Sequence, residues 1–210
     1  MKKWKLTITT LILGTILYSP KVSAKNLANI SDFRIKSALL AQSDPKEAIV
    51  YFHRGINRHT SGDTKGAIEE YNQALQLHPN FPEVYYKRGI SRHKLGDLKG
   101  AILDYNKAIS LNANYPGIYN HRGFTRHNLG DLKGAIADFN KALSLNPNFP
   151  EAYQNRGITR NALGDKQGAI TDLTTAANLF QQQKRISNYQ EVIDLIQKIK
   201  IPDFLKKSGI

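Results

Sequence analysis

The sequence GINRHTSGDTKGAI at residues 55–68 returns as GISRHKLGDLKGAI at 89–102, as GFTRHNLGDLKGAI at 123–136 and as GITRNALGDKQGAI at 157–170. Successive copies begin 34 residues apart, with no insertion between them. A fixed period of this length indicates one supersecondary unit that is stacked on copies of itself. Because stacked repeats present an extended surface to a partner, the pattern favours a binding function over catalysis.

Each copy is predicted to form two helices joined by a tight turn. In the second copy, apolar and small residues recur at helical spacing between Tyr85 and Leu111. Gly96-Asp97 interrupts them, since glycine commonly ends a helix and aspartate accepts hydrogen bonds from the first amides of the next one. Proline-containing segments such as 146–150 separate the pairs of helices, because proline disfavours helix at the preceding residue.

This pattern resembles the tetratricopeptide repeat family over residues 48–183, which divide into the units 48–81, 82–115, 116–149 and 150–183. Every unit has an aromatic residue at place 4, glycine at place 8, Gly-Asp at places 15 and 16, and alanine at places 20 and 27. The large residues at place 24 are Tyr71, Tyr105, Phe139 and Leu173. The resemblance implies an all-α fold, a right-handed superhelical solenoid of four helix-turn-helix units with a C-terminal capping helix.

The N-terminal residues 1–24 are predicted to be a secretory signal peptide. Three lysines precede a 13-residue stretch that is largely apolar, and Val22-Ser23-Ala24 offers a cleavage site after Ala24. An uncleaved anchor is the alternative, although 13 residues are fewer than the roughly 20 that a spanning helix needs. We therefore expect an exported protein that does not span the membrane after cleavage, with the periplasm as its compartment and a thylakoid lumen or secretion as alternatives.

The segments that flank the repeats have amphipathic patterns of their own. Residues 25–47 form a leader that we expect to be partly helical, since Ile30, Phe33 and Leu40 share one helical face. Asp44-Pro45 predicts the start of the first repeat helix. Residues 184–210 are predicted to hold the capping helix, within 187–200, and a frayed tail.

The composition is basic and contains no cysteine. The chain of 210 residues has a net charge of +13, and removal of residues 1–24 leaves 26 basic against 17 acidic side chains, or +9. Such a charge favours acidic partners and bears on association rather than on fold. The absence of cysteine excludes disulfides and cysteine-ligated metals.

Two arginines recur in every unit, at places 7 and 11, where this family more often has leucine and an aromatic residue. They are Arg54, Arg58, Arg88, Arg92, Arg122, Arg126, Arg156 and Arg160. Acids recur on the second helices as Glu70, Asp104, Asp138 and Asp172. This arginine ladder could pair internally with the acids, or it could bind anions, since guanidinium recognises carboxylate and phosphate. One such acid per unit is too few for two arginines, so we expect one arginine of each unit to remain free for an acidic ligand.

The resemblance also implies a ligand groove on the concave face, lined by places 5, 9, 12 and 13 of the first helices. The candidate groove residues are Phe52, Ile56, His59, Tyr86, Ile90, His93, Lys94, Asn120, Phe124, His127 and Ile158. An apolar floor with polar edges suits an extended or helical peptide. The alternative is that this stripe is packing between neighbouring first helices.

Other site chemistries fit the sequence poorly. The histidine pairs 53/59 and 121/127 are six residues apart and so share no helical face as metal ligands would. No catalytic set, phosphate-binding loop or cofactor motif is found in the sequence, and nucleic acid is disfavoured because aromatic stacking places do not recur in every unit. At the positions that hold chaperone tails in this family, the chain has Phe52, Ile56, Lys87, Gly117 and His121, which do not match.

The sequence therefore predicts a non-catalytic, extracytoplasmic scaffold that binds a protein or peptide, either acidic or amphipathic. The alternative is a self-associating scaffold or assembly factor that forms homo-oligomers.

Overall fold

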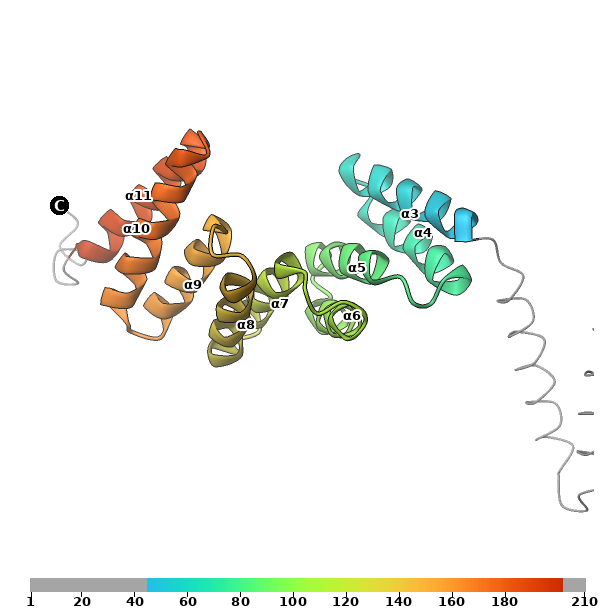
Figure 1. Cartoon of the computed structure of the whole chain (residues 1–210), viewed down its shortest axis with the longest axis horizontal. Helices are drawn as coiled ribbons and strands as arrows, with labels where there is room; N and C mark the ends of the chain where they lie inside the picture. The colour runs from blue at the N-terminus through green and yellow to red at the C-terminus, as the bar shows by residue number, and fades with distance from the viewer. Residues whose placement is uncertain (1–44, 202–210) are drawn as a thin grey trace, which may run out of the picture. The chain divides into compact units, whose positions relative to one another are not determined.

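The computed structural model describes residues 45–201, so the predictions for the signal peptide, for the leader up to residue 44 and for the tail lie outside this part. All regular elements of residues 45–201 are α-helices (Figure 1). They are α3 (Pro45–Thr60), α4 (Thr64–Leu77), α5 (Pro82–Lys94), α6 (Leu98–Leu111), α7 (Pro116–Asn128), α8 (Leu132–Leu145), α9 (Pro150–Ala162), α10 (Lys166–Gln182) and α11 (Ile186–Lys200). None of these helices combines the length and the apolar character that crossing a membrane requires.

Four helical hairpins follow one another along the chain: α3 with α4, α5 with α6, α7 with α8, and α9 with α10. The second helix of each hairpin also contacts the first helix of the next one, and α11 packs on α10. This arrangement confirms the predicted all-α solenoid of four helix-turn-helix units with a C-terminal capping helix.

The turn inside each hairpin has the structure that Gly-Asp predicts. Gly96 has a φ of +83°, a left-handed conformation that glycine adopts without strain. Asp97 then caps α6 by accepting a hydrogen bond from the amide of Gly100 at 2.9 Å. At the other boundary Pro82 begins α5, where its missing N–H costs no helical hydrogen bond.

The core of each hairpin is formed where glycine and alanine let the two helices approach. In the third unit Ala135 and Phe139 of α8 are fully buried. A Cβ placed on Gly123 of α7 would stand 2.7 Å from Cε1 of Phe139, which is too close for van der Waals contact. Glycine at place 8 is therefore needed because the ring at place 24 packs directly against the backbone of the first helix.

Helix α11 covers the last hairpin with one apolar face. Val192 and Ile196 are buried against Ala177 and Phe180 of α10. The opposite face of α11 carries exposed polar residues such as Glu191 and Lys198. This helix closes the end of the stack in the way that the amphipathic pattern predicts.

Candidate functional site: the arginine ladder and the first-helix face

In the second, third and fourth units the arginine ladder is built around one buried aspartate per unit. In the third unit Arg122 donates from Nε and Nη2 to the two carboxylate oxygens of Asp138, at 2.9 and 2.6 Å. Arg126 donates from Nη1 to the same carboxylate at 2.9 Å. Both arginines therefore end on Asp138, which is only 3 % exposed. Arg88 and Arg92 converge in the same way on Asp104, and Arg156 and Arg160 on Asp172.

The expectation of one free arginine per unit does not hold in the second, third and fourth units. That expectation counted only the acid within the second helix as a partner for the arginines, and it left out the aspartate that caps the same helix. Asp131 Oδ2 stands 3.7 Å from Nε of Arg126, so each unit supplies two acids for its two arginines. These three units contain a charge-balanced ladder in which the arginines serve the fold.

The first unit departs from this arrangement. Glu70 replaces the aspartate, and its Oε1 stands 3.1 Å from Nε of Arg58 in an ion pair, while Nη1 of Arg58 donates to Asp63. Arg54 has no acidic partner within residues 45–201, and its guanidinium lies 5.7 Å from the ring centre of Tyr51. The longer glutamate thus changes the pairing, and both arginines of the first unit, Arg54 and Arg58, remain exposed.

A row of asparagines, which the sequence analysis overlooked, links the units. Nη1 of Arg122 donates to the Oδ1 atom of Asn106 in the preceding unit at 2.7 Å. Arg88 makes the same bond to Asn72, and Arg156 to Asn140. The sequence pattern contains this row, because Asn72, Asn106 and Asn140 recur 34 residues apart, each two residues after the acid of its second helix. Each of these arginines therefore joins its own unit to the one before it.

Three of the candidate groove residues, the histidines at place 12, also join neighbouring units. Nδ1 of His93 lies 2.8 Å from Oγ1 of Thr125, a buried hydroxyl that itself donates to the carbonyl of His121. Because this hydroxyl proton is already used, Nδ1 of His93 must be the donor, and Nε2 is left as the acceptor in the neutral ring. His59 pairs likewise with Ser91, and His127 with Thr159.

Burial shifts the titration of several of these rings. Desolvation lowers the pKa of His93, and it is also the largest cause of the lowered pKa of His59, where Lys94 and Lys87 add charge repulsion. His121 has a lowered pKa for the same main reason, opposed by the hydrogen bond from its Nδ1 to the carbonyl of Gly117. These histidines are therefore held in the neutral form by packing.

The residues at place 5 of the predicted groove contact side chains of their own unit and of the next one. Tyr86 is buried and lies against Tyr105, Tyr115 and His121. Asn120 is buried and accepts a hydrogen bond from Asn155 at 3.0 Å. Phe52 packs on Phe81 with ring centres 5.2 Å apart. For Tyr86 and Asn120 the alternative of packing between neighbouring first helices describes the contacts better than an open groove does, although Phe52 and Tyr86 also line a cavity of about 180 Å³.

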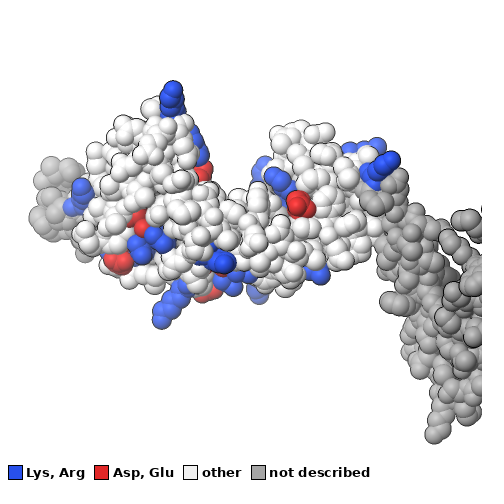
Figure 2. Space-filling model, viewed as in Figure 1, with Lys and Arg blue, Asp and Glu red and all other residues white. Residues whose placement is uncertain are grey.

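Among the candidate groove residues, the row at place 9 and Lys94 at place 13 form a set whose members are all half-buried or exposed. We call this row the first-helix face; it consists of Ile56, Ile90, Phe124, Ile158 and Lys94. The isoleucines are half-buried, whereas Phe124 is 41 % exposed and stacks on His93 with ring centres 5.2 Å apart. Figure 2 shows that uncharged side chains dominate the side of the molecule in view.

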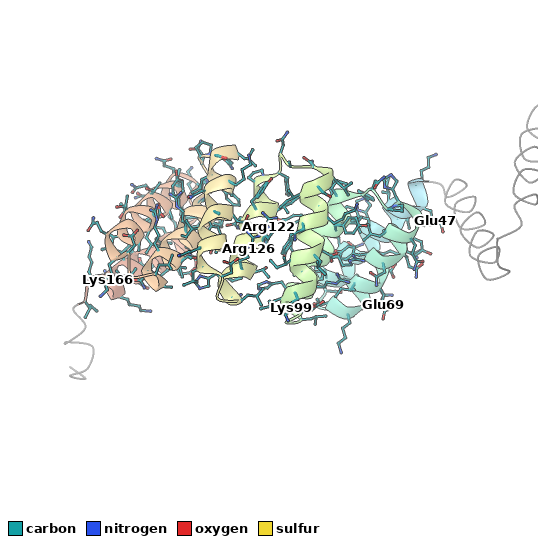
Figure 3. The ribbon with its side chains drawn as sticks, turned by 90° about the horizontal axis from the view of Figure 1, so that it is seen from below. Glu47, Glu69, Lys99, Arg122, Arg126 and Lys166 are labelled. Carbon is teal, nitrogen blue, oxygen red and sulfur yellow. The ribbon has the colours of Figure 1, made fainter. Side chains whose placement is uncertain are left out.

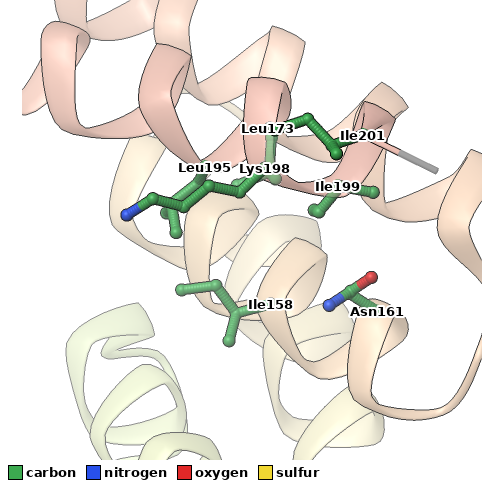
Figure 4. Close-up of a pocket in the computed structure, with 7 residues that line it drawn as sticks. All are labelled: Ile158, Asn161, Leu173, Leu195, Lys198, Ile199 and Ile201. Carbon is green, nitrogen blue, oxygen red and sulfur yellow. The ribbon is translucent and has the colours of Figure 1, made fainter. Parts of the chain in front are cut away.

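A cavity of about 440 Å³ opens at the C-terminal end of this face. Its apolar wall comes from Ile158 of α9, Leu173 of α10 and Leu195 and Ile199 of α11, with Asn161 and Lys198 at its edges (Figure 4). An apolar cavity with one amide and one ammonium group can hold an apolar side chain and a neighbouring acceptor. No group of three or more His, Cys, Asp or Glu able to hold a metal occurs within residues 45–201.

Comparison with known proteins agrees with this architecture. The family model described as TPR repeat matches residues 58–96, 91–130 and 125–164. The chain belongs to the TPR repeat family. Among proteins with curated descriptions, none matches this TPR sequence.

Solved structures of several TPR proteins resemble this one. The first TPR of Spaghetti (RPAP3), bound to the HSP90 peptide SRMEEVD, is 29% identical, with a TM-score of 0.57 over 58% of this chain and 96% of that chain. A crystal structure of MamA is 22% identical, with a TM-score of 0.62 over 78% of this chain and 98% of that one. The TPR2B domain of yeast Sti1, in a complex with pHsp70, is 24% identical, with a TM-score of 0.54 over 56% and 94% of the two chains.

Proposed function

We propose that this TPR protein is a non-catalytic scaffold of an extracytoplasmic compartment that holds a protein segment on its first-helix face. The observation that carries the proposal is the exposure of Phe124. It lies in an apolar row whose three isoleucines are half-buried, and stacking of the hairpins leaves its own ring 41 % exposed. Support comes from the related TPR of Spaghetti, which binds a peptide.

The chemistry of the face favours an amphipathic segment. Apolar side chains of the partner would contact Phe124 and enter the cavity beside Ile158, since burial of apolar area is the main source of affinity. Acidic groups of the partner would meet Lys94 and Lys198, because the arginines of units two to four are already paired with aspartates. The preference for acidic partners thus rests on lysines and not on the arginine ladder.

A capture experiment tests this function. The purified chain serves as bait in an envelope extract, and bound proteins are quantified for the unchanged chain and for Phe124→Ser. Leu163→Ser is the matched control, because Leu163 is similarly exposed but lies at a hairpin turn. We expect Phe124→Ser to lose a specific set of partners that the control retains. Equal capture by both variants would contradict binding at this face.

The compartment is tested separately. Residues 1–24 have the pattern of a signal peptide, so N-terminal sequencing of the protein isolated from its cells should begin near Lys25. An intact Met1 on cytoplasmic protein would overturn the proposed localisation and leave the binding face untouched.

Self-association is the second candidate, and one observation favours it. Val50 of α3 is 48 % exposed, whereas Val84, Ile118 and Ala152, at the same place in the later units, are buried by the preceding hairpin. A second copy could cover this edge. Sedimentation analysis of the unchanged chain and of Val50→Lys tests it: a dimer that the substitution abolishes supports the candidate, and a monomer in both cases excludes it.

A further inference from the structure

The positive charge of the described chain does not come from its arginine ladder. Residues 45–201 contain 21 basic and 14 acidic side chains. The arginines at places 7 and 11 account for eight of the basic ones, and the acids beside them at places 16 and 23 account for eight of the acidic ones. The remaining side chains are 13 basic and six acidic. Net charge on the surface is therefore carried mainly by lysines.

These lysines gather on the second helices of the two central units. On α6, Lys99, Leu103 and Lys107 follow at intervals of four residues, and all three are exposed. Residues four apart share one face of a helix, so the three side chains form one stripe. On α8 the same places hold Lys133, Ala137 and Lys141, which are also exposed. We call these six residues the lysine face.

Acidic groups do not neutralise this face. The acids within α6 and α8 are Asp104 and Asp138, which are buried and bound by arginines. The capping residues Asp97 and Asp131 are about half exposed, and each stands beside an arginine of its own unit. On the second helix of the first unit, α4, an acidic residue stands at the corresponding place: Glu69 is there where α6 has Leu103.

The two lysine stripes lie on second helices of successive units, and α7 contacts both of these helices. The guanidinium of Arg122 donates both to Asn106 of α6 and to Asp138 of α8, so one side chain bridges the two helices. Figure 3 shows the end of α6 at Lys99 from below, with Arg122 and Arg126 beside it. Along each helix the two lysines are about 12 Å apart, since eight residues rise about 1.5 Å each. Four ammonium groups are thereby exposed on the second helices of the two central units.

Leu103 is an exposed apolar residue within the lysine face. It is 68 % exposed, the largest value among the exposed large apolar residues of residues 45–201. A leucine in that position between Lys99 and Lys107 gains nothing from packing within this chain. Binding to the interface of an anionic bilayer grows with the apolar area that is buried and with attraction to the anionic lipids, and this stripe offers one leucine and two lysines for these two contributions.

We propose that the lysine face binds the surface of a membrane rich in anionic lipids. The lysines would meet the headgroups, and Leu103 would enter the boundary between headgroups and acyl chains. Lysine side chains are long and flexible, and these lysines do not surround a groove. Such an arrangement suits the diffuse negative charge of a membrane surface better than one defined anion. Because this face lies on second helices, the TPR array could bind the membrane there and keep its first-helix face free, so the inference is independent of the proposed function.

Vesicle binding by the full chain tests this inference. The probe is a series of phosphatidylcholine vesicles with increasing fractions of phosphatidylglycerol, and bound protein is measured by co-sedimentation. We expect binding that grows with the anionic fraction and weakens with salt. Lys99→Gln combined with Lys107→Gln should weaken binding on the order of 30-fold, since each lysine near such a surface contributes about fivefold. The control is Lys184→Gln combined with Lys200→Gln, which removes the same charge from exposed lysines elsewhere and should retain most of the binding.

A second comparison separates a membrane from a soluble polyanion. Leu103→Ser should weaken vesicle binding severalfold and leave binding of inorganic polyphosphate unchanged, because only a bilayer offers an apolar layer for this residue. Two results would overturn the proposal: the same affinity for vesicles in the lysine-face pair as in the control pair, or an unchanged affinity for vesicles in Leu103→Ser. Binding through residues 1–44 would give the first of these results, because all variants share that segment.

Discussion

Arg122 and Asp138 form a bidentate ion pair across the third hairpin, and Asp138 receives a third hydrogen bond from Arg126. Asp138→Ala would leave two guanidinium groups without their shared acceptor in a half-buried place. We expect the free energy of unfolding to fall by about 3–5 kcal/mol, as for other broken buried pairs. Urea unfolding followed by circular dichroism measures it.

The capping residue Asp131 provides the matched control for Asp138. It is about half exposed, and its main structural role is to accept from the amide of Gly134. Asp131→Ala should cost only about 1 kcal/mol, the usual effect of losing a helix cap. Equal effects of the two substitutions would contradict the central place of Asp138 in the ladder.

Ala135 occupies the close crossing of α7 and α8 and is fully buried. Ala135→Leu should overpack this crossing and lower the free energy of unfolding by about 1–3 kcal/mol. Ala137→Leu on the same helix adds the same atoms at an exposed place and should leave stability nearly unchanged. A stable Ala135→Leu variant would show that the two helices have room to separate.

Helix α11 is expected to be necessary for a soluble array. Deleting residues 187–210 would expose Phe180 and Leu173, both fully buried in the intact chain. The truncated chain should melt at a lower temperature and aggregate, because the last hairpin loses the cover of its apolar face. Thermal melting and light scattering check this, and an unchanged monomer would contradict the capping role.

Acidification should destabilise the array through its packed histidines. The pKa values of His59, His93 and His121 lie below 6.5 in the folded chain, so the unfolded chain takes up protons first as the pH falls. Stability from these groups is complete above about pH 6.5 and is lost as the pH falls through the folded pKa values. Melting temperatures between pH 7.5 and 5 should therefore decrease.

The variant His93→Asn tests the cause of this pH dependence. The fourth unit has Asn161 at the same place, so an amide is compatible with the repeat there. We expect a weaker decrease of melting temperature with pH than in the unchanged chain. An identical pH profile would assign the effect to other groups.

The sequence predicted the fold well because its signals are local. Gly96-Asp97 and Pro82 determine where helices end and begin, and the 34-residue period repeats these signals four times. Helix boundaries depend on such short-range chemistry, and the structure follows them closely. The capping helix was equally visible from the spacing of Val192 and Ile196.

The candidate site was predicted less completely because its contacts join different units. His93 was assigned to a groove edge, but its partner Thr125 stands 32 residues away on another helix. Burial of Tyr86 and Asn120 depends on how closely the units stack, which periodicity does not specify. The role of Arg126 was misjudged because Asp131 was considered only as a cap, although its carboxylate also faces the guanidinium.

The central claim is that the first-helix face of this TPR array contacts a partner. Site-specific photocrosslinking in the native cells tests it most directly, with the reactive side chain at position 124 in one variant and at the turn position 163 in another. We predict discrete crosslinked products from position 124 that are absent at 163. Products of equal abundance at both positions, or none at position 124, would contradict the claim.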